Sequence, residues 1–466
     1  MRRWLARRLW FPLQEAVKGH ETLRILREMQ AADRLSVDEL RAEQVRRLRA
    51  FIDSCYTHVP YVRMQMDRAR LKPADVRQPA DLAPLPLLRK SDIRSHRLEL
   101  RSSRASRLQS STTGGSTGEP LIFDIGRRRI ASRVACRLRV SAWWDVTIGD
   151  SEVALWGSSI ELGRQDRIRN MRDWLLATRL VSAFNMTDEA MSRCLDLIET
   201  RGCRQLFGYP SAIYLLCLHA RKQRRDLRPV GIRAVFVTGE MLLPHQRETI
   251  AETFACQVAD GYGGRDSGFI AHECPDGNMH LMSDAVIVEI LDAEGRPVAA
   301  GESGEIVVTD LYSEEAPFIR YATGDIATAS ARTCSCGRPY PLIERVEGRT
   351  NDLVVAPDGR LINSLALIYP VREVAGIEQY RIVQKTVDTF HVELACDGAF
   401  DRAAEDRIRG GWQRLLRAPV HVTFEYVPRI PPERGGKFRH VRSEVSAIAA
   451  ANAAADVSSI SVGDHS

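Results

Sequence analysis

Hydroxyl side chains and glycines are concentrated in one short tract of the sequence, Ser110-Ser111-Thr112-Thr113-Gly114-Gly115-Ser116-Thr117-Gly118-Glu119-Pro120. Glycines let the backbone come close to a ligand, while hydroxyls and backbone N–H groups donate hydrogen bonds to an anion. This composition is typical of a loop that binds phosphate, and it therefore points to a nucleotide. The tract lacks the Gly-Lys-Ser/Thr ending of a Walker A loop and is not a dinucleotide fingerprint. Taken alone, it fits a flexible linker equally well.

Four later segments carry chemistry that would complete a nucleotide site. In Gly261-Tyr262-Gly263-Gly264-Arg265-Asp266, an aromatic ring and a carboxylate flank a glycine turn, as stacking of a base and binding of magnesium require. In Tyr321-Ala322-Thr323-Gly324-Asp325, the last carboxylate has two oxygens that can accept hydrogen bonds from both hydroxyls of a ribose. Gly348-Arg349 and Gly435-Gly436-Lys437-Phe438-Arg439 follow. Each segment alone has an ordinary alternative, such as a surface turn or a solvated basic loop.

Taken in this order, the segments resemble the core motifs of the adenylate-forming superfamily of acyl-CoA and aryl-CoA synthetases. The likeness is closest to the phenylacetate-CoA ligase family, including its relatives from capsular polysaccharide clusters. Further support comes from Val59-Pro60-Tyr61-Val62-Arg63, Gly208-Tyr209-Pro210-Ser211 and Thr238-Gly239-Glu240-Met241-Leu242. The family implies two half-reactions. A carboxylate attacks the α-phosphate of ATP to give an acyl-adenylate and pyrophosphate, and a thiol, usually that of coenzyme A, then displaces AMP.

The resemblance also implies which residues do this work. Lys437 is expected to reach in from a small C-terminal domain and stabilise the charge that grows on the phosphate oxygens. Asp266 stands where the superfamily usually has a glutamate that helps to position Mg²⁺; because aspartate is shorter, direct contact and a bridging water both stay open. Asn351 and Asp352 are expected at the hinge about which the small domain rotates. The residues expected to bind ATP or AMP are Ser111, Thr112, Thr113, Gly114, Gly115, Ser116, Thr117, Gly118, Gly239, Glu240, Tyr262, Gly263, Asp325 and Arg349.

The acid and the acceptor are less constrained by the sequence. Trp156, Gly157 and the run Phe207-Gly208-Tyr209-Pro210 are candidates for an apolar pocket that holds a carboxylic acid, although core packing accounts for the same residues. An aryl-CoA or acyl-CoA thioester is the expected product. Transfer of the acyl group to a carrier protein, an amine or a sugar is an alternative, and so is a non-catalytic nucleotide-binding scaffold.

The cysteines include one closely spaced pair, Cys334-Ser335-Cys336. Together with His272 and Cys274, this pair would supply the four nitrogen and sulfur ligands of a structural zinc. His280 is an alternative ligand, and two ordinary loops with free thiols are the alternative to a metal site. Some relatives in the family carry a comparable zinc site, which favours the metal.

Several folding units are needed to position these segments, because 466 residues exceed one ordinary core. Apolar residues at three- and four-residue spacing predict helices over residues 12–58. Helical stretches then alternate with β-branched runs at residues 153–156, 234–237, 286–290 and 305–308, which predicts an α/β fold with covered sheets. We expect an N-terminal helical subregion over 1–58, a large adenylation domain over 59–348, a small mobile α+β domain over 349–446 and a disordered tail over 447–466.

Composition limits the partners and the compartment. The net charge of +6 is small for this length and argues against a general nucleic-acid surface. The sequence shows no bilayer-spanning run and no secretory signal, and its ten cysteines are dispersed, so we expect a cytoplasmic protein. The first ten residues combine arginines with tryptophan and leucine. They are expected either to rest on the protein itself or to lie as a basic amphipathic helix on an anionic membrane. The resemblance also suggests a homodimer.

Overall fold

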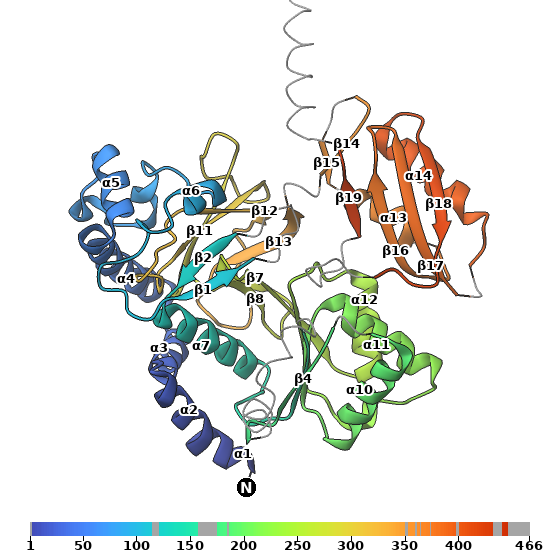
Figure 1. Cartoon of the computed structure of the whole chain (residues 1–466), viewed down its shortest axis with the longest axis horizontal. Helices are drawn as coiled ribbons and strands as arrows, with labels where there is room; N and C mark the ends of the chain where they lie inside the picture. The colour runs from blue at the N-terminus through green and yellow to red at the C-terminus, as the bar shows by residue number, and fades with distance from the viewer. Residues whose placement is uncertain are drawn as a thin grey trace, which may run out of the picture. The chain divides into compact units, whose positions relative to one another are not determined.

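The computed structural model describes residues 2–113, 121–156, 175–183, 186–349, 353–358, 361–363, 365–372, 374–397, 400–431 and 440–445. Within the chain, contacts define two compact units (Figure 1). The larger unit includes Met1–Thr323 and Ala327–Val346, and the smaller unit includes Gly324–Ile326 and Glu347–Glu433. The fold is α/β, as the sequence predicted.

The N-terminal region is helical, which confirms the prediction for residues 12–58. A capping box, in which Ser36 and Glu39 bind each other's backbone N–H groups, starts the longest helix. The helices are α1 (Arg2–Leu5), η1 (Ala6–Trp10), α2 (Phe11–Lys18), α3 (Thr22–Ala32), α4 (Val37–His58) and α5 (Pro60–Arg68), followed by η2 (Pro73–Asp75), η3 (Pro79–Leu82) and α6 (Lys90–Ser95). None of the described helices combines the length and apolar character needed to cross a bilayer.

An eleven-stranded sheet forms the centre of the larger unit. One half is parallel, in the order β7 (Gln257–Gly264), β6 (Ala234–Thr238), β5 (Gln205–Gly208), β3 (Glu152–Leu155) and β4 (Thr178–Val181). The other half continues from β7 through β8 (Gly268–Glu273), β9 (Met279–Leu281), β13 (Leu342–Arg349), β12 (Tyr321–Ala329), β11 (Ser303–Asp310) and β10 (Val286–Leu291). The β-branched runs predicted to be strands are therefore β3, β6, β10 and β11.

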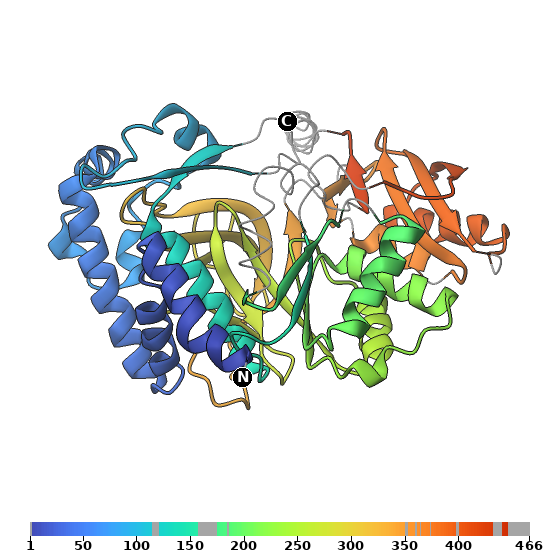
Figure 2. The same ribbon diagram turned by 60° about the horizontal axis from the view of Figure 1, so that its bottom comes forward.

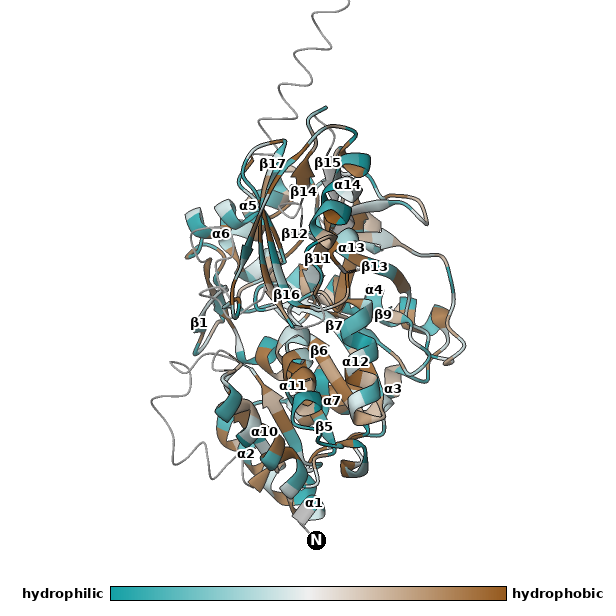
Figure 3. Ribbon diagram, turned by 90° about the vertical axis from the view of Figure 1, so that its right-hand side faces the viewer, coloured by the Kyte–Doolittle hydropathy of each residue, from teal (hydrophilic) through white to brown (hydrophobic). Residues whose placement is uncertain are grey.

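Helices cover both faces of the parallel half, because its strands are apolar on both sides. Val235 and Val237 of β6 pack in one core with the helices α10 (Asp188–Thr200), α11 (Pro210–Lys222) and α12 (Pro244–Phe254), near the short helix η4 (Arg228–Val230). Phe236 points the other way, into a core with α7 (Arg127–Trp143) and α3. Figure 2 shows the N-terminal helices in blue alongside α7 in teal. In Figure 3, the helices that cover the sheet are coloured partly teal, for hydrophilic residues, and partly brown, for hydrophobic residues.

The smaller unit has its own core. A four-stranded sheet in the order β18 (His421–Tyr426), β17 (Thr389–Cys396), β16 (Ile377–Gln384) and β19 (Val441–Ser443) packs with α13 (Leu365–Arg372) and α14 (Ala404–Leu416). A hairpin of β14 (Leu353–Val355) and β15 (Leu361–Asn363) lies beside it. The fully buried Gln384 joins these parts, since its side chain bonds both backbone groups of Val355 and accepts from the Ser443 hydroxyl at 2.7 Å.

Candidate functional site

Four of the segments singled out in the sequence meet at one edge of the large sheet. Trp156 directly follows β3, Tyr209 follows β5, Gly239 follows β6, and Tyr262 lies in β7. The register pairs Leu155 with Gly208, Gly208 with Val237, and Thr238 with Gly261, so these strands end at the same level. In open α/β sheets, ligands bind outside the carboxyl ends of the strands, at the point where successive connections diverge. That point lies here between β3, which leads to β4, and β5, which leads to β6 on the opposite side.

The described residues on either side of the glycines in the tract pair as two antiparallel strands. The strands β1 (Gln109–Thr112) and β2 (Ile122–Ile125) pair antiparallel. Beyond them, the Thr113 N–H donates to the Leu121 carbonyl at 3.0 Å, and the Leu121 N–H donates to the Thr113 hydroxyl at 3.0 Å. The two ends of the tract are therefore paired within the larger unit, and its phosphate-binding role stays a prediction. Ser111 and Thr112 lie in β1, and Gly114, Gly115, Ser116, Thr117 and Gly118 lie outside the described residues.

A buried ion cluster fixes this hairpin to the larger unit. Asp124 of β2 is almost fully buried and contacts Arg97 at 2.5 Å and Arg101 at 2.7 Å. Although burial raises the pKa of the Asp124 carboxyl, hydrogen bonds and charge from the two arginines outweigh it and lower that pKa. Arg97 also donates to the Ser110 hydroxyl at 3.0 Å. The base of the tract is thus held in one place by charge-assisted bonds.

The glycine turn after β7 meets the end of the tract. Arg265 donates a hydrogen bond from Nη1 to the Thr112 carbonyl at 3.5 Å, which brings together segments about 150 residues apart. The turn itself requires glycine, because a Cβ on Gly263 would lie 2.3 Å from the Gly268 carbonyl oxygen. This hydrogen bond therefore places the backbone of Thr112 next to the turn that follows Tyr262 and Gly263.

Asp266 is positioned by three residues to which the sequence assigned no role, Tyr321, Ser267 and Arg129. The Tyr321 hydroxyl donates to its Oδ2 at 2.6 Å, and the Ser267 N–H donates to its Oδ1 at 3.1 Å. Arg129, which is fully buried in α7, donates to the Asp266 carbonyl and contacts Asp310 at 2.6 Å. A carboxylate has about four acceptor positions, so these two bonds leave room for a cation or its water. Tyr321 opens a motif visible in the sequence, whereas nothing local marks Arg129.

Aromatic side chains form a wall at the diverging point of the sheet. The rings of Trp156 and Tyr209 stack with centroids 4.2 Å apart, and Phe207 lies 5.3 Å from Trp156. Gly239 approaches this wall so closely that a Cβ there would lie 3.1 Å from Tyr209, and its φ of +84° also favours glycine. Glu240 accepts a hydrogen bond from the Ser211 N–H at 3.2 Å, which ties β6 to the start of α11. A flat apolar wall beside polar groups suits a carboxylic acid with an apolar body.

The other residues expected to bind ATP or AMP, Asp325 and Arg349, lie in the later segments of the sequence. Asp325 lies in β12 after Gly324, which has a φ of +79°. Arg349 is the last residue of β13. Lys437 and the expected hinge residues Asn351 and Asp352 lie outside the described residues, so their roles stay predictions.

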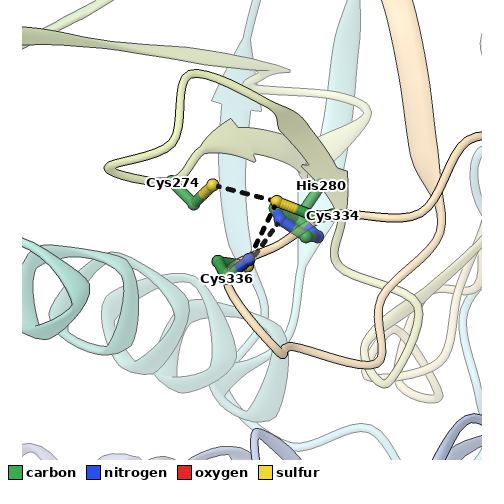
Figure 4. Close-up of side chains that lie close together, drawn as sticks. All are labelled: Cys274, His280, Cys334 and Cys336. Carbon is green, nitrogen blue, oxygen red and sulfur yellow. Dashed lines mark hydrogen bonds between the residues drawn. The ribbon is translucent and has the colours of Figure 1, made fainter.

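Three cysteines and one histidine gather at the far end of the β8 strand (Figure 4). The set is Cys274, His280, Cys334 and Cys336, with all four candidate ligand atoms within 4.8 Å of one another. His280 therefore takes the place that was expected for His272, which corrects the predicted ligand set. The Nδ1 atom of His272 lies instead 2.8 Å from the Glu273 carbonyl, and burial lowers the pKa of His272 to about 4.

The geometry of this cysteine cluster fits a tetrahedral zinc. Sγ of Cys274 lies 3.6 Å from Sγ of Cys334, and Sγ of Cys336 lies 3.3 Å from Nε2 of His280. Zinc with bonds of about 2.3 Å to sulfur holds two sulfurs about 3.8 Å apart. Nδ1 of His280 contacts the Tyr340 carbonyl at 3.1 Å, which leaves Nε2 as the ligand atom. Burial opposes ionisation of Cys334, but hydrogen bonds from the Cys336 N–H and other neighbours lower the pKa of this thiol.

Comparisons with known families match two parts of the chain. Residues 176–311 match the family of AMP-binding enzymes, and residues 354–444 match the CapK C-terminal domain. The first match spans β4, β5, β6 and β7 of the parallel half and the turn of Asp266. The second spans most of the smaller unit.

Individual relatives match over most of their length. A phenylacetate-coenzyme A ligase of Thermus thermophilus is 23% identical over 438 residues, which cover 87% of this chain and 96% of the relative. Protein CapK of Staphylococcus aureus is 21% identical over 364 residues, covering 77% of this chain and 80% of that protein. Among solved structures, a 2-hydroxyisobutyryl-CoA ligase in complex with R3-HIB-AMP has a TM-score of 0.73 and 20% identity, covering 91% of this chain and 94% of that one. This last likeness concerns the fold.

Proposed function

Because this chain belongs to the phenylacetate-CoA ligase family of adenylate-forming enzymes, which includes CapK, we propose that it is an ATP-dependent, AMP-forming carboxylate ligase. It activates an aryl or acyl carboxylic acid as an acyl-adenylate and transfers the acyl group to coenzyme A, forming a carbon–sulfur bond. The observation that carries the proposal is the meeting of three separate motifs, through the contacts of Arg265 with Thr112 and of Tyr321 with Asp266.

In the first half-reaction, a carboxylate oxygen of the acid attacks the α-phosphorus of ATP, and pyrophosphate leaves. The hydroxyl and glycine tract binds the β- and γ-phosphates, and Lys437 stabilises the charge that develops on the α-phosphate. Magnesium, when bound near Asp266, neutralises phosphate charge. Tyr321 and Ser267 hold the Asp266 carboxylate in one orientation, so that little reorganisation is needed during the reaction.

The acid lies with its apolar body against the wall of Trp156 and Tyr209. This wall stands at the edge where Gly239 and Tyr262 also lie, so a carboxylate presented from it points to the nucleotide motifs. The stacked rings favour a flat or branched apolar acid over a charged one. Tyr262 stacks near adenine, and Asp325 and Arg349 bind the ribose and the phosphate side of AMP.

In the second half-reaction, a thiol sulfur attacks the acyl carbon, the bond to phosphate breaks, and AMP leaves. The smaller unit carries Lys437 and turns about Asn351 and Asp352 between the two steps. One observation favours a second candidate acceptor. Because residues 354–444 match the CapK C-terminal domain, a carrier protein, an amine or a sugar hydroxyl is the alternative to coenzyme A.

The direct test uses the full chain with ATP, magnesium, coenzyme A and a panel of aromatic and aliphatic carboxylic acids. We expect at least one acid to give AMP and an acyl-CoA thioester in equal amounts, and we expect Lys437→Ala to give neither. AMP release that depends on the acid but yields no thioester would favour the alternative acceptor. If no acid on the panel leads to AMP, the proposal fails.

We also propose that Cys274, His280, Cys334 and Cys336 hold a structural zinc. The four ligands leave no open coordination position, so the ion would stabilise the loops after β8 and before β13 without taking part in the reaction. Metal analysis of protein purified without chelator should give about one zinc per chain. A content near zero, or one unchanged in a Cys334→Ser and Cys336→Ser double variant, would remove this proposal.

A further inference from the structure

The N-terminal helical segment exposes a row of large apolar side chains. Trp4 is 64% exposed, Leu9 47%, Leu13 52% and Val17 80%; we call these four residues the apolar stripe. Across all described residues, nine large hydrophobic side chains are at least 36% exposed, and the apolar stripe supplies four of them within fourteen residues. Single exposed apolar residues need no explanation, but such a concentration on one short segment does.

The spacing of the apolar stripe follows the geometry of the segment. Trp4, Leu9 and Leu13 are separated by steps of five and then four residues. The five-residue step crosses η1, a π-helical turn in which the Phe11 N–H bonds to the Ala6 carbonyl. A second row, Ala6, Phe11 and Glu15, repeats the same steps two residues later and is buried. Two residues amount to roughly half a helical turn, so the two rows lie on opposite sides.

Contacts on the buried side fix the rotation of the segment. Arg3 binds the Thr147 hydroxyl at 2.9 Å and the Asp150 carboxylate at 3.1 Å. Gly149 approaches so closely that a Cβ there would lie 2.9 Å from the Cβ of Ala6. One side of the segment therefore rests on the larger unit, as one of the two expectations from the sequence had it, while the apolar stripe faces away.

The exposed charged side chains described in α1, η1 and α2 are all basic. Arg7 and Arg8 are exposed, and Lys18 is exposed at the end of α2. Glu15 is the only acid in α1, η1 and α2; it is 2% exposed and bonds with Thr22, His20 and Lys18. A partner surface that complements this face therefore has an apolar interior covered by an anionic outer layer.

We propose that the apolar stripe docks the protein onto a membrane surface that contains anionic lipids. An amphipathic helix with basic flanks lies in the plane of the interface, with its apolar side chains among the acyl chains and its cations near lipid phosphates. Trp4 suits the boundary between headgroups and acyl chains. A second copy of the chain is a poorer occupant, because a two-fold interface would bring two basic faces together.

The test is flotation of the full-length protein with lipid vesicles. We expect binding to vesicles of phosphatidylglycerol mixed with phosphatidylcholine, and a marked decrease in salt or with phosphatidylcholine alone. The Leu9→Gln and Leu13→Gln double variant should lower the vesicle partition coefficient about tenfold or more, and Arg7→Gln with Arg8→Gln should do so to a similar extent. Leu98→Gln, at a side chain that is 71% exposed outside this segment, is the matched control and should bind like the wild type.

All variants should keep the thermal stability of the wild type, since the substituted side chains are exposed. Absence of binding to the anionic vesicles overturns the proposal. So does binding that the Leu9→Gln and Leu13→Gln variant retains. A dimer that this variant dissociates, without any vesicle binding by the wild type, would assign the apolar stripe to a second copy instead. None of these outcomes depends on the ligase activity.

Discussion

The two ends of the β7–β8 hairpin differ in the side chains that they carry and in what those side chains contact. At the turn, Gly263 lets two strands come close, and Asp266 is held by a tyrosine hydroxyl and a backbone N–H. At the other end, Cys274 joins His280 and two further cysteines in a closed set. The turn presents groups to the edge of the sheet at which we propose that ATP and the acid bind, whereas the cysteine cluster directs its groups at one another. Substitutions at the turn end should therefore change rates, and substitutions in the cysteine cluster should change stability.

The largest effect on rate is expected from Lys437, for which we propose a role in adenylation. Lys437→Ala should lose about 3 kcal/mol of transition-state stabilisation in adenylation, on the order of a hundredfold or more in rate. Thiol transfer from a preformed acyl-adenylate should be nearly unchanged, as should the melting temperature. Single-turnover assays of each half-reaction measure this, with Arg442→Ala as a control that also removes a cation beside this segment. Equal losses in both half-reactions would contradict the assigned role.

The cysteine cluster should show the opposite pattern. In the Cys334→Ser and Cys336→Ser double variant, the free energy of unfolding should fall by about 2 to 3 kcal/mol because the proposed zinc would no longer be held. Adenylation per folded molecule should stay within about twofold of the wild type. Denaturant unfolding checks the first expectation, and Cys396→Ser, at a partly buried cysteine outside the cluster, is the control. A large loss of rate without loss of stability would contradict a purely structural role for the cysteine cluster.

The aromatic wall of Trp156 and Tyr209 lies at the same edge of the sheet as the glycine turn. We expect its loss to weaken binding of the acid. Trp156→Ala should raise the KM for the acid about tenfold, since a stacked aromatic contact contributes about 1 to 1.5 kcal/mol. The KM for ATP should be unaffected. Steady-state kinetics with each substrate varied in turn would separate the two effects. Trp4→Ala, which removes an exposed indole, should change neither constant. A change confined to the KM for ATP would count against the assigned pocket.

Between the two ends of the hairpin, Asp260 should show a smaller, pH-dependent effect. Burial and then the negative charge of Glu273 raise the pKa of Asp260 to about 7. Since its unfolded pKa is lower, the native state holds a proton that the unfolded state releases, and stability falls as pH rises towards 7. Asp260→Asn should remove this loss, so it should stabilise the protein by about 1 kcal/mol at about pH 8 and much less at about pH 5. Equal effects at both pH values would contradict the shifted pKa.

Much of the fold was predictable because its signals are local. The β-branched runs became β3, β6, β10 and β11, and the apolar periodicity of residues 12–58 became helices. The pairing of the two ends of the hydroxyl and glycine tract was not predictable from composition. It rests on the hydrogen bonds between Thr113 and Leu121, and a hairpin connection and a linker use the same residues.

The site was predictable only where its residues form motifs. Asp266 and Tyr262 lie in a glycine turn that is visible in the sequence, whereas Arg129 reaches Asp266 from a helix more than a hundred residues earlier. In the cysteine cluster, proximity in sequence to Cys274 favoured His272. Alternation along β8 and the pairing of β8 with β9 bring His280 to the cluster instead, and such pairings across a sheet are set by tertiary structure.

We propose that the edge formed by β3, β5, β6 and β7 performs adenylation. Exchange of labelled pyrophosphate into ATP tests it most directly, because it reports the first half-reaction whatever the acceptor. In the presence of a matching carboxylic acid and no thiol, the wild-type chain should exchange pyrophosphate, and the cysteine cluster variant should do so at a similar rate per folded molecule. Exchange that is absent with every acid, or that Lys437→Ala retains at the wild-type rate, would contradict the account.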